Sequence, residues 1–595
     1  MTVVLCLTPA ALPTARLIRN GVPGAQLHGL AGRVEDADEL FADTMAHMRE
    51  LFAQGKRIIG VCAAGILVRA VAPLLADKQS EPAVLAVAVD GSAVVPLLGG
   101  HHGANQLARQ VAMLTGGQAA ITTAGDVALG LALDEPPAGW RVGNPAAIKP
   151  VTAALLAGGR VRLEVEAGNA EWLDGLPTAE DGQPLVRVTD HAVATDEDEL
   201  LLHPPVLALG VGCERDCDPA ELAGLVDEVL AANSLAAGAI ACVVSVDLKA
   251  CEPAVLQLAQ RLGVPARFFT PARLADEAPR LANPSEVVAR EIGCPGVSEG
   301  AALAAAGPQA ILVVEKTKSK RATLAIARSP DCIDAGAVGR GRGRLSVVGI
   351  GPGWAGWRAP EASAAIAAAT DLVGYGLYLD LLGDAALGKA RHESDLGAEA
   401  DRARMALELA GRGKDVALIC SGDAGIYALA TLVFELLDRE RHADWMRAEI
   451  QVIPGISALQ AAAARAGAPV NHDFCTISLS DLLTPWETIE KRLQAAAAAD
   501  FVVCFYNPVS KRRRDQLARA RDILLSGRGP ETPVILARQL GRPEESIRII
   551  TLGELTPDHA DMLTLVLVGS SETRRMRAGS REWVYTPRGY AKKLS

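Results

Sequence analysis

Short apolar runs recur along the chain, and each is followed by a glycine-containing turn and then by an alanine-rich segment with helical spacing. Clear examples are the runs at 57–62, 206–211 and 345–349. A continuous apolar run of about five residues predicts a strand that is buried on both faces. Strands that alternate with helices are typical of α/β units built on parallel sheets. We therefore expect an α/β protein with parallel or mixed sheets flanked by helices.

The chain has 595 residues, which is too long for one core, and a prior of about 150 residues per domain predicts about four domains. The clearest boundary is the stretch 331–344, where glycine and arginine alternate and no core can form. A softer break lies near 190–205. The expected division is an N-terminal α/β domain at 1–126, an intervening region at 127–204, a small α/β domain at 205–330, a linker at 331–344 and a C-terminal domain at 345–595.

The net charge of −11 excludes a general nucleic-acid-binding protein, since such proteins present a basic face. No stretch reaches about 18 apolar residues without a charge or a breaker, so no membrane span is expected. The segment 1–6 lacks a cationic region and predicts a first strand rather than a signal peptide. Eleven scattered cysteines indicate a reducing compartment. These features together predict a cytoplasmic protein.

A glycine-rich turn, Gly349 to Gly353, follows the predicted strand at 345–348. Pro352 removes a backbone N–H that a phosphate would need, and no Gly-Lys-Ser/Thr sequence follows. The turn is therefore expected to let a large, flat ligand approach the main chain. This makes Gly349, Gly351, Pro352 and Gly353 candidate substrate contacts.

Three further strand-to-turn junctions follow in the same region. The strand at 415–420 enters a small-residue turn that holds Asp423, and the strands at 450–453 and 501–506 end in similar turns. Open α/β sheets bind ligands at the carboxyl ends of their strands. Four such turns within about 250 residues therefore predict one ligand site.

A nucleotide-dependent oxidoreductase, with 349–353 as its dinucleotide loop, is an alternative from a different class. It requires an acidic residue at the end of the next strand, about 20 residues further on. The strand expected at 371–375 ends in Gly374 and Tyr375 instead. This makes the oxidoreductase the less favoured hypothesis.

The motifs GIGPG, SGDAGIYALA, VIPGISALQAAAARAGAP, NHDFCTISLSDLLTPWETIEKRL and FYNPVSKRR occur in this order between 345 and 595. They resemble the precorrin-3B C17-methyltransferases of the tetrapyrrole methylase family. The resemblance implies a two-lobed α/β fold with the methyl donor, S-adenosyl-L-methionine, between the lobes. It also implies C17 methylation coupled to contraction of the macrocycle, which yields precorrin-4. By analogy, a homodimer through this domain is expected.

The resemblance also implies, by position, a donor site. Its residues would be Ser421, Gly422, Asp423, Ile426, Ser457, Ala458 and Asn507. Methyl transfer from a sulfonium is an in-line displacement, so positioning matters more than a strong protein acid. Ring contraction needs proton transfers, for which His472, Asp473 and Asp481 are the candidates. Alternatively, His472 and Asp473 only turn the chain before the next strand.

A basic cluster, Lys511, Arg512 and Arg513, follows the last of the four turns. Beside a ligand-facing turn it would bind the acetate and propionate carboxylates of a precorrin-type substrate. The alternative is a solvated helix face.

The N-terminal half has its own candidate chemistry. The segments GVCAAGILVR, KQSEPAVLAVAVDGSAVVPLLGGHHGANQLAR and VEKTK resemble the cobalt-precorrin-5A hydrolases. That resemblance implies opening of a lactone and release of acetaldehyde, and so a multifunctional enzyme. His101 or His102 would be the base, with Glu299 and Lys316 as further candidates. Because neighbouring histidines point apart, no metal is expected.

Two observations leave the hydrolase hypothesis open. The family segment usually has a single histidine where this chain has His101 and His102. Lactone hydrolysis also belongs to the early-cobalt route, whereas a precorrin-3B substrate belongs to the late-cobalt route. The alternative is therefore the same methyltransferase with a non-catalytic, corrinoid-binding N-terminal module.

Overall fold

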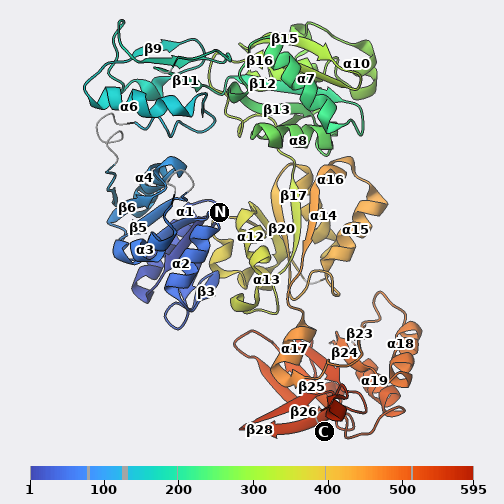
Figure 1. Ribbon diagram of the computed structural model, residues 1–595. Helices are drawn as coiled ribbons and strands as arrows, with labels where there is room; N and C mark the ends of the chain where they lie inside the picture. The colour runs from blue at the N-terminus through green and yellow to red at the C-terminus, as the bar shows by residue number, and fades with distance from the viewer. Residues whose placement is uncertain are drawn as a thin grey trace. The chain divides into compact units, whose positions relative to one another are not determined.

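The computed structural model describes residues 2–76, 81–122, 131–196, 198–395, 397–510 and 513–593. The chain divides into two compact units. Unit 1 comprises Met1–Leu345, Leu407–Val416 and Glu440–Glu449, and unit 2 comprises Ser346–Ala406, Ala417–Arg439 and Ile450–Ser595. The predicted fold class is confirmed, because the sheets are parallel or mixed and helices flank them (Figure 1).

A seven-stranded sheet of order β3-β2-β1-β4-β5-β6-β7 opens unit 1. Its strands are β1 (Thr2–Cys6), β2 (Ala25–Leu30), β3 (Glu39–Phe41), β4 (Arg57–Val61), β5 (Val84–Val87), β6 (Ala93–Leu98) and β7 (Gln118–Ala119). Neighbouring strands are parallel except β5 and β6, which are antiparallel. The expected first strand is present as β1, between β2 and β4 in the interior of the sheet.

In the described part of this region, four helices cover the two faces of the sheet. Successive residues of β1 point to opposite faces and pack with different helices. The helices are α1 (Leu12–Gly21), α2 (Thr44–Ala53), α3 (Ala64–Val71) and α4 (Ala104–Thr115). Val4 and Cys6 pack with α1 and α4, whereas Val3 and Leu5 pack with α2 and α3. Burial on both faces explains why β1 is apolar throughout.

Two smaller sheets follow in unit 1. The first has the order β8-β11-β10-β9, and the second has the order β14-β13-β12-β16-β15. The strands of the first are β8 (Arg141–Val142), β9 (Arg162–Val165), β10 (Leu185–Val188) and β11 (Glu199–His203), with helix α6 (Ile148–Leu156). The strands of the second are β12 (Leu207–Cys213), β13 (Ile240–Val246), β14 (Ala266–Phe269), β15 (Ile311–Lys318) and β16 (Ala322–Arg328).

The second of these sheets is covered on both faces. Its helices are α7 (Pro219–Ala232), α8 (Pro253–Leu262), α9 (Pro271–Ala275), α10 (Glu286–Ile292) and α11 (Ser298–Ala306). Helices α7 and α8 pack on one face, and α9 and α11 pack on the other. Strands β12, β13 and β14 are parallel, while β15 and β16 form an antiparallel pair.

The glycine- and arginine-rich stretch before 345 belongs to unit 1 and is bonded to other parts of it. Arg340 and Phe268 exchange two backbone hydrogen bonds of 2.8 and 2.9 Å. The Arg267 guanidinium donates to three carbonyl oxygens of the stretch, one of them the Val338 oxygen at 2.6 Å. Arg340 also pairs with Asp247 at 2.7 Å. The stretch therefore forms specific contacts with strand β14, although its composition alone suggested a simple tether.

A five-stranded sheet of order β19-β18-β20-β17-β21 begins the C-terminal region. Its strands are β17 (Arg344–Gly349), β18 (Asp371–Tyr375), β19 (Ala390–Ser394), β20 (Asp415–Cys420) and β21 (Glu449–Ile453). The accompanying helices are α12 (Pro360–Ala368), α13 (Gly376–Asp380), α14 (Glu399–Gly411), α15 (Leu429–Glu440) and α16 (Ala443–Arg447). Strands β18 and β20 begin and end at the residues expected from their apolar runs.

The second lobe of unit 2 has a five-stranded sheet, β23-β24-β27-β25-β26, and a three-stranded one, β22-β29-β28. The strands are β22 (Gly467–Ala468), β23 (Phe474–Ser478), β24 (Val502–Tyr506), β25 (Pro533–Arg538), β26 (Ser546–Thr551), β27 (Thr564–Val568), β28 (Arg574–Ala578) and β29 (Arg581–Tyr585). Helices α18 (Trp486–Ala498) and α19 (Asp515–Leu525) cover one face of the larger sheet, and α17 (Ala458–Ala466) covers the other. These lobes confirm the predicted two-lobed methylase fold.

Among the described residues, no helix combines the length and the apolar character that crossing a membrane would require.

Candidate functional site

A cleft in unit 2 collects residues from the turns that end five strands, from helix α13 and from the start of β27. They are Pro352, Tyr378, Ser421, Gly422, Asp423, Ile426, Tyr427, Ser457, Ala458, Tyr506, Asn507, Ala537, Gln539, Leu540, Arg542, Met562, Leu563, Thr564 and Leu565. All seven residues expected at the methyl-donor site are in this set. The expected donor-site residues, from Ser421 to Asn507, are up to 86 positions apart in the chain and meet at one cleft.

Asp423 connects two of the turns that form the cleft. Its Oδ1 accepts a hydrogen bond from the Gly425 amide at 2.8 Å, and its Oδ2 accepts one from the Gly455 amide at 3.0 Å. Both carboxylate oxygens are thereby used to hold main chain, one within the turn after β20 and one across to the turn after β21. Asp423 therefore fixes the shape of the cleft wall.

The glycines of these turns allow backbone to meet backbone. A Cβ at Gly455 would lie 2.2 Å from the Gly422 oxygen and 2.6 Å from the Gly349 oxygen. Gly351 and Gly422 exchange two backbone hydrogen bonds of 2.8 and 3.1 Å. The close packing explains why small residues are required here.

The expectation that the turn at 349–353 receives a flat ligand is only partly met. Of its four candidates, Pro352 lines the cleft, whereas Gly349, Gly351 and Gly353 do not. A Cβ at Gly353 would lie 2.7 Å from Cγ of Arg542. These glycines therefore make room for neighbouring loops and for an arginine side chain.

The amino end of helix α17 lies at the cleft. Ser457 caps it: the Ser457 hydroxyl accepts from the Gln460 amide at 3.2 Å, and the Gln460 side chain accepts from the Ser457 amide at 2.9 Å. The backbone amide of Leu459, in the first turn of the helix, donates to the Tyr506 hydroxyl at 3.3 Å. A helix amino end carries a partial positive charge, so this wall of the cleft favours an anionic group.

Three cleft residues have left-handed backbone conformations that are rare for residues other than glycine: Tyr427 (φ 51°), Asn507 (φ 50°) and Gln539 (φ 50°). Such strain collects where a surrounding structure positions functional groups. The Asn507 amide donates to the Ser478 hydroxyl at 3.2 Å. The Tyr427 hydroxyl donates to the Thr476 carbonyl at 3.1 Å.

Tyr506 lies at the end of β24, next to Tyr427, and their ring centroids are 5.0 Å apart. Burial raises the pKa of Tyr506 to about 12. The phenol is therefore neutral at physiological pH and offers a hydroxyl, not a charge, to the cleft.

Arg542 is the one cationic side chain among the described residues that line the cleft, and it was missed from the sequence. Its Nε donates to the Pro352 carbonyl at 3.1 Å, and a terminal nitrogen lies 3.4 Å from the Ser421 hydroxyl. The available signal was a Gly-Arg-Pro turn after an apolar strand, at 541–543. That turn lacks the small-residue pattern by which the other four were found.

Of the predicted basic cluster, the structure describes only Arg513. The Arg513 side chain is 9% exposed, and it donates to the Asn507 carbonyl at 2.7 Å and the Leu479 carbonyl at 2.9 Å. Burial lowers the pKa of Arg513. Its guanidinium thus stabilises the turn after β24 and does not line the cleft. Lys511 and Arg512 lie outside the described residues.

None of the three proton-transfer candidates lines the cleft. His472 and Asp473 precede β23, whereas the cleft gathers the carboxyl ends of the strands. The two side chains are 51% and 80% exposed, and His472 Nδ1 accepts from the Asp473 amide. This local contact matches the alternative of a chain turn. Asp481 follows the carboxyl end of β23, and its carboxylate accepts from the Gln516 amide at 2.9 Å.

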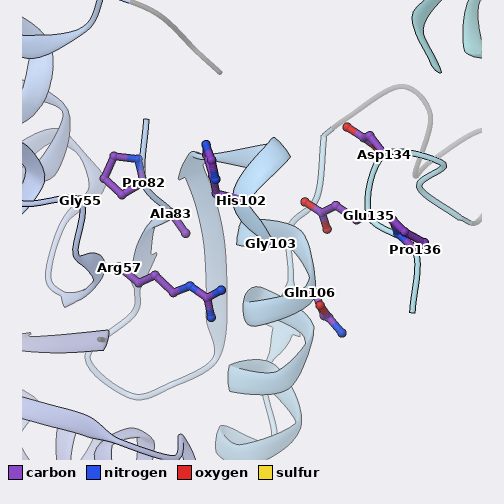
Figure 2. Close-up of a pocket in the computed structure, with 10 residues that line it drawn as sticks. All are labelled: Gly55, Arg57, Pro82, Ala83, His102, Gly103, Gln106, Asp134, Glu135 and Pro136. Atoms are coloured by element: carbon purple, nitrogen blue, oxygen red, sulfur yellow. The ribbon is translucent and has the colours of Figure 1, made fainter. Parts of the chain in front are cut away.

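In unit 1, His102 lines a second pocket (Figure 2). The lining residues are Gly55, Arg57, Pro82, Ala83, His102, Gly103, Gln106, Asp134, Glu135 and Pro136. Because β6 is antiparallel to β5, the turn after β6 lies at the amino ends of β4 and β5. This is the edge opposite to the one that parallel sheets ordinarily use for ligands. The side chain of His101 lies outside the described part of the chain.

Glu299 is 1% exposed and belongs to the fold of unit 1. Its carboxylate accepts from the Asn283 amide at 2.9 Å, the Asn283 side chain at 3.0 Å and the Lys316 amide at 2.9 Å. Burial by itself would raise the pKa of Glu299, but these hydrogen bonds outweigh it and the pKa lies below its ordinary value. Such a carboxylate is a poor base, and it anchors two loops.

Three parts of the chain match known families. Residues 344–556 match the tetrapyrrole (corrin/porphyrin) methylases, 46–126 match the N-terminal region of cobalamin synthesis protein G, and 207–327 match its C-terminus. These matches define the class, a methylase fused to segments of a second cobalamin-synthesis protein.

Individual relatives narrow this class. The precorrin-3B C(17)-methyltransferase of Sinorhizobium sp is 47% identical over 250 residues, which cover 42% of this chain and 98% of that protein. The cobalamin biosynthesis protein CobIJ of Mycobacterium tuberculosis is 44% identical over 252 residues, 42% of this chain and 48% of that one, so the match spans about half of that relative. The crystal structure of the methyltransferase CobJ is 46% identical, with 41% of this chain and 100% of that one covered and a TM-score of 0.39. The chain belongs to the tetrapyrrole methylase family.

Proposed function

We propose that the region 345–595 transfers a methyl group from S-adenosyl-L-methionine to C17 of a precorrin-3B-type tetrapyrrole, coupled to ring contraction that yields precorrin-4. The observation that carries the proposal is the convergence of all seven expected donor-site residues on one cleft. The relative named for C17 methylation, matched over 98% of its length, supports the substrate class.

The cleft residues fit the donor. When bound, S-adenosyl-L-methionine would supply a methyl group on a positively charged sulfur. An enamine-like carbon of the substrate would attack that methyl carbon in line, and the sulfur would leave as the neutral thioether of S-adenosyl-L-homocysteine. Ser421, Ser457 and Asn507 offer polar groups for a nucleoside and an amino acid. The amino end of α17 favours the donor's carboxylate. Asp423 already accepts two amides, and its remaining lone pairs can accept hydroxyl hydrogens.

Positioning is the main contribution asked of the protein, because the displacement needs no strong acid or base. Tyr427 and Asn507 are held in left-handed conformations beside Tyr506. Burial raises the pKa of Tyr506 to about 12, so its phenol is neutral and can donate or accept a hydrogen bond without placing a negative charge beside the donor's sulfonium. The cleft is therefore suited to hold the donor rigidly while the substrate carbon attacks.

We assign the substrate's carboxylates to Arg542. An arginine fork binds a carboxylate through two parallel hydrogen bonds, and Arg542 stands at the cleft wall between Pro352 and Ser421. Lys511 and Arg512 remain candidates for further carboxylates of the same substrate.

Ring contraction requires a proton acceptor near the macrocycle, and Asp481 is the proposed group. It follows β23 at the same sheet edge as Tyr506 and Asn507, since β23 and β24 are parallel and in register. Its carboxylate is 36% exposed, accepts a hydrogen bond from the Gln516 side chain at 2.9 Å and pairs with Arg513 Nε at 3.8 Å. His472 and Asp473 precede the strand and are less well placed.

For the N-terminal half we propose lactone opening of the cobalt-precorrin-5A hydrolase type, with His102 as the base. The pocket at His102 also contains Arg57 and Gln106, which can bind a substrate carboxylate, together with the carboxylates of Asp134 and Glu135. The position of the pocket at the amino ends of β4 and β5 favours the second candidate, a non-catalytic module that binds corrinoid intermediates. Acetaldehyde release from a lactone-bearing substrate distinguishes the two.

The domain boundaries at 126, 204, 330 and 344 and a homodimer through 345–595 are further proposals. No described strand crosses the first three boundaries, and β17 begins at Arg344, one residue before the fourth. Sedimentation of the full chain tests the dimer.

The deciding experiment uses the purified full chain with methyl-labelled S-adenosyl-L-methionine and either metal-free precorrin-3B or its cobalt form. Mass spectrometry is expected to find a product heavier by one labelled methyl, with the absorption spectrum of a contracted ring. The form that reacts identifies the cobalt state of the substrate. If the donor binds and neither form gains a methyl, the substrate proposal is wrong.

A further inference from the structure

Three side chains from separate elements converge at the edge of the N-terminal sheet: His28 of β2, Glu39 of β3 and His47 of α2. His28 and Glu39 are in register on parallel strands, so both point to the same face of the sheet. Helix α2 covers that face. One ligand atom from each residue can be chosen so that all three lie within 4.8 Å of one another.

The ring of His28 presents a nitrogen to each of the other two side chains. Its Nδ1 lies 2.8 Å from Nε2 of His47, and its Nε2 lies 3.6 Å from a carboxylate oxygen of Glu39. The His28 side chain is 3% exposed. Its Nε2 is buried and makes no hydrogen bond with the described residues. A buried ring nitrogen without a partner costs about 1–3 kcal/mol.

The other two ligands are accessible from solvent. The Glu39 side chain is 47% exposed, and His47 is half-buried. The ring of Phe41 stacks on that of His47, with centroids 4.4 Å apart and planes 8° apart, which fixes the imidazole's orientation. In this cluster His28 is buried, His47 is held in place by Phe41, and Glu39 faces solvent.

We propose that His28, Glu39 and His47 bind one divalent transition-metal ion of the zinc type, with a remaining coordination position open to solvent. Two imidazoles and one carboxylate are a ligand set that zinc accepts. Tetrahedral ligands about 2.0–2.1 Å from zinc lie roughly 3.3 Å from one another. His28 Nε2 and the Glu39 carboxylate, 3.6 Å apart, are close to that spacing. His47, which now contacts Nδ1 of His28, must move toward the Nε2 side, so that the three ligand atoms contract from their present span of up to 4.8 Å. The metal supplies the partner that buried Nε2 lacks.

The site is separate from the chemistry proposed above. The matched family segment begins at residue 46, so His28 and Glu39 lie before it. The sequence prediction of no metal considered only His101 and His102, which are neighbours in the chain. Here the ligands are separated by 11 and 8 residues, and only strand register and helix packing bring them together.

The test uses the tag-free full chain, stripped of metal with a chelator and dialysed. Titration with Zn²⁺ by calorimetry and with Co²⁺ by visible absorption is expected to find one ion per chain at this site. Glu39→Gln and His47→Gln, both on the open side, are expected to lose at least about tenfold in affinity. His442→Gln, an exposed histidine outside the cluster, is the matched control and keeps full affinity.

Thermal melting provides a second readout. Added Zn²⁺ is expected to raise the Tm of the native chain and of His442→Gln, and to raise that of Glu39→Gln and His47→Gln much less. A native chain that binds no ion, or variants that bind as tightly as the native chain, overturns the proposal and leaves a hydrogen-bonded histidine pair.

Discussion

Asp423→Asn tests whether the Asp423 carboxylate determines the shape of the donor cleft. The two carboxylate oxygens accept from two different amides, those of Gly425 and Gly455. An asparagine of nearly the same size has only one oxygen. Whichever way its amide is turned, an NH₂ group faces a backbone N–H, so one hydrogen bond is replaced by a contact between two donors.

The magnitude follows from the bond that is lost. A hydrogen bond to a charged group contributes about 1.5–3 kcal/mol, and about 1.4 kcal/mol corresponds to a tenfold change in an equilibrium constant. If donor binding requires both turns to be held by these hydrogen bonds, the affinity for S-adenosylhomocysteine falls by roughly 10- to 150-fold.

Calorimetry with S-adenosylhomocysteine and the full chain measures this effect. Asp401→Asn, which removes the same charge at an 82% exposed position of α14, is the matched control and is expected to bind like the native chain. Binding by Asp423→Asn within twofold of the native chain would refute the idea that this carboxylate holds the two turns together.

Three further predictions concern other positions. Gly455→Ala places a Cβ 2.2 Å from the Gly422 oxygen, so the two turns must separate. Methyl-transfer activity should therefore fall about 100-fold. An unchanged kcat/KM in the methylation assay would contradict this close packing. Arg542→Gln should raise KM for the tetrapyrrole by about 10- to 100-fold while the Kd for the donor changes less, with Arg542→Lys intermediate; equal effects on both ligands argue against a substrate contact. Because the pKa of Glu299 lies below its ordinary value of about 4.5, its charged form stabilises the fold above that pH, and the stability is lost as the pH falls through the folded-state pKa. Glu299→Gln should therefore lower Tm at neutral pH and reduce the loss of Tm below about pH 4.5; Tm profiles parallel to those of the native chain would contradict this assignment.

The strands and the donor-site turns could be predicted from sequence because their signals are local. Strands β18 and β20 coincide with apolar runs, and the turn at 421–427 follows directly from β20. In a parallel sheet the carboxyl ends of neighbouring strands share one edge. The turns with Ser421 and Ser457 follow two strands of one sheet, β20 and β21, and so share its edge. Asn507 follows β24 of the second lobe's sheet, and it reaches the same cleft only because the two lobes pack together.

The candidates that failed to reach the cleft were judged by residue type without knowledge of which end of a strand they occupy. His472 and Asp473 precede β23, and Arg513 turns inward to carbonyl oxygens. A side chain's partners depend on its neighbours in space, so neither outcome was accessible from residue type alone.

The sequence by itself determined the α/β class, the positions of the central strands and the donor-site turns, since hydrophobic periodicity and glycine-rich turns act over a few residues. Only the tertiary structure decided that Arg542 lines the cleft and that Glu299 anchors loops. It also decided that His28 and His47 meet, because strand register and helix packing join segments whose local sequences carry no record of one another.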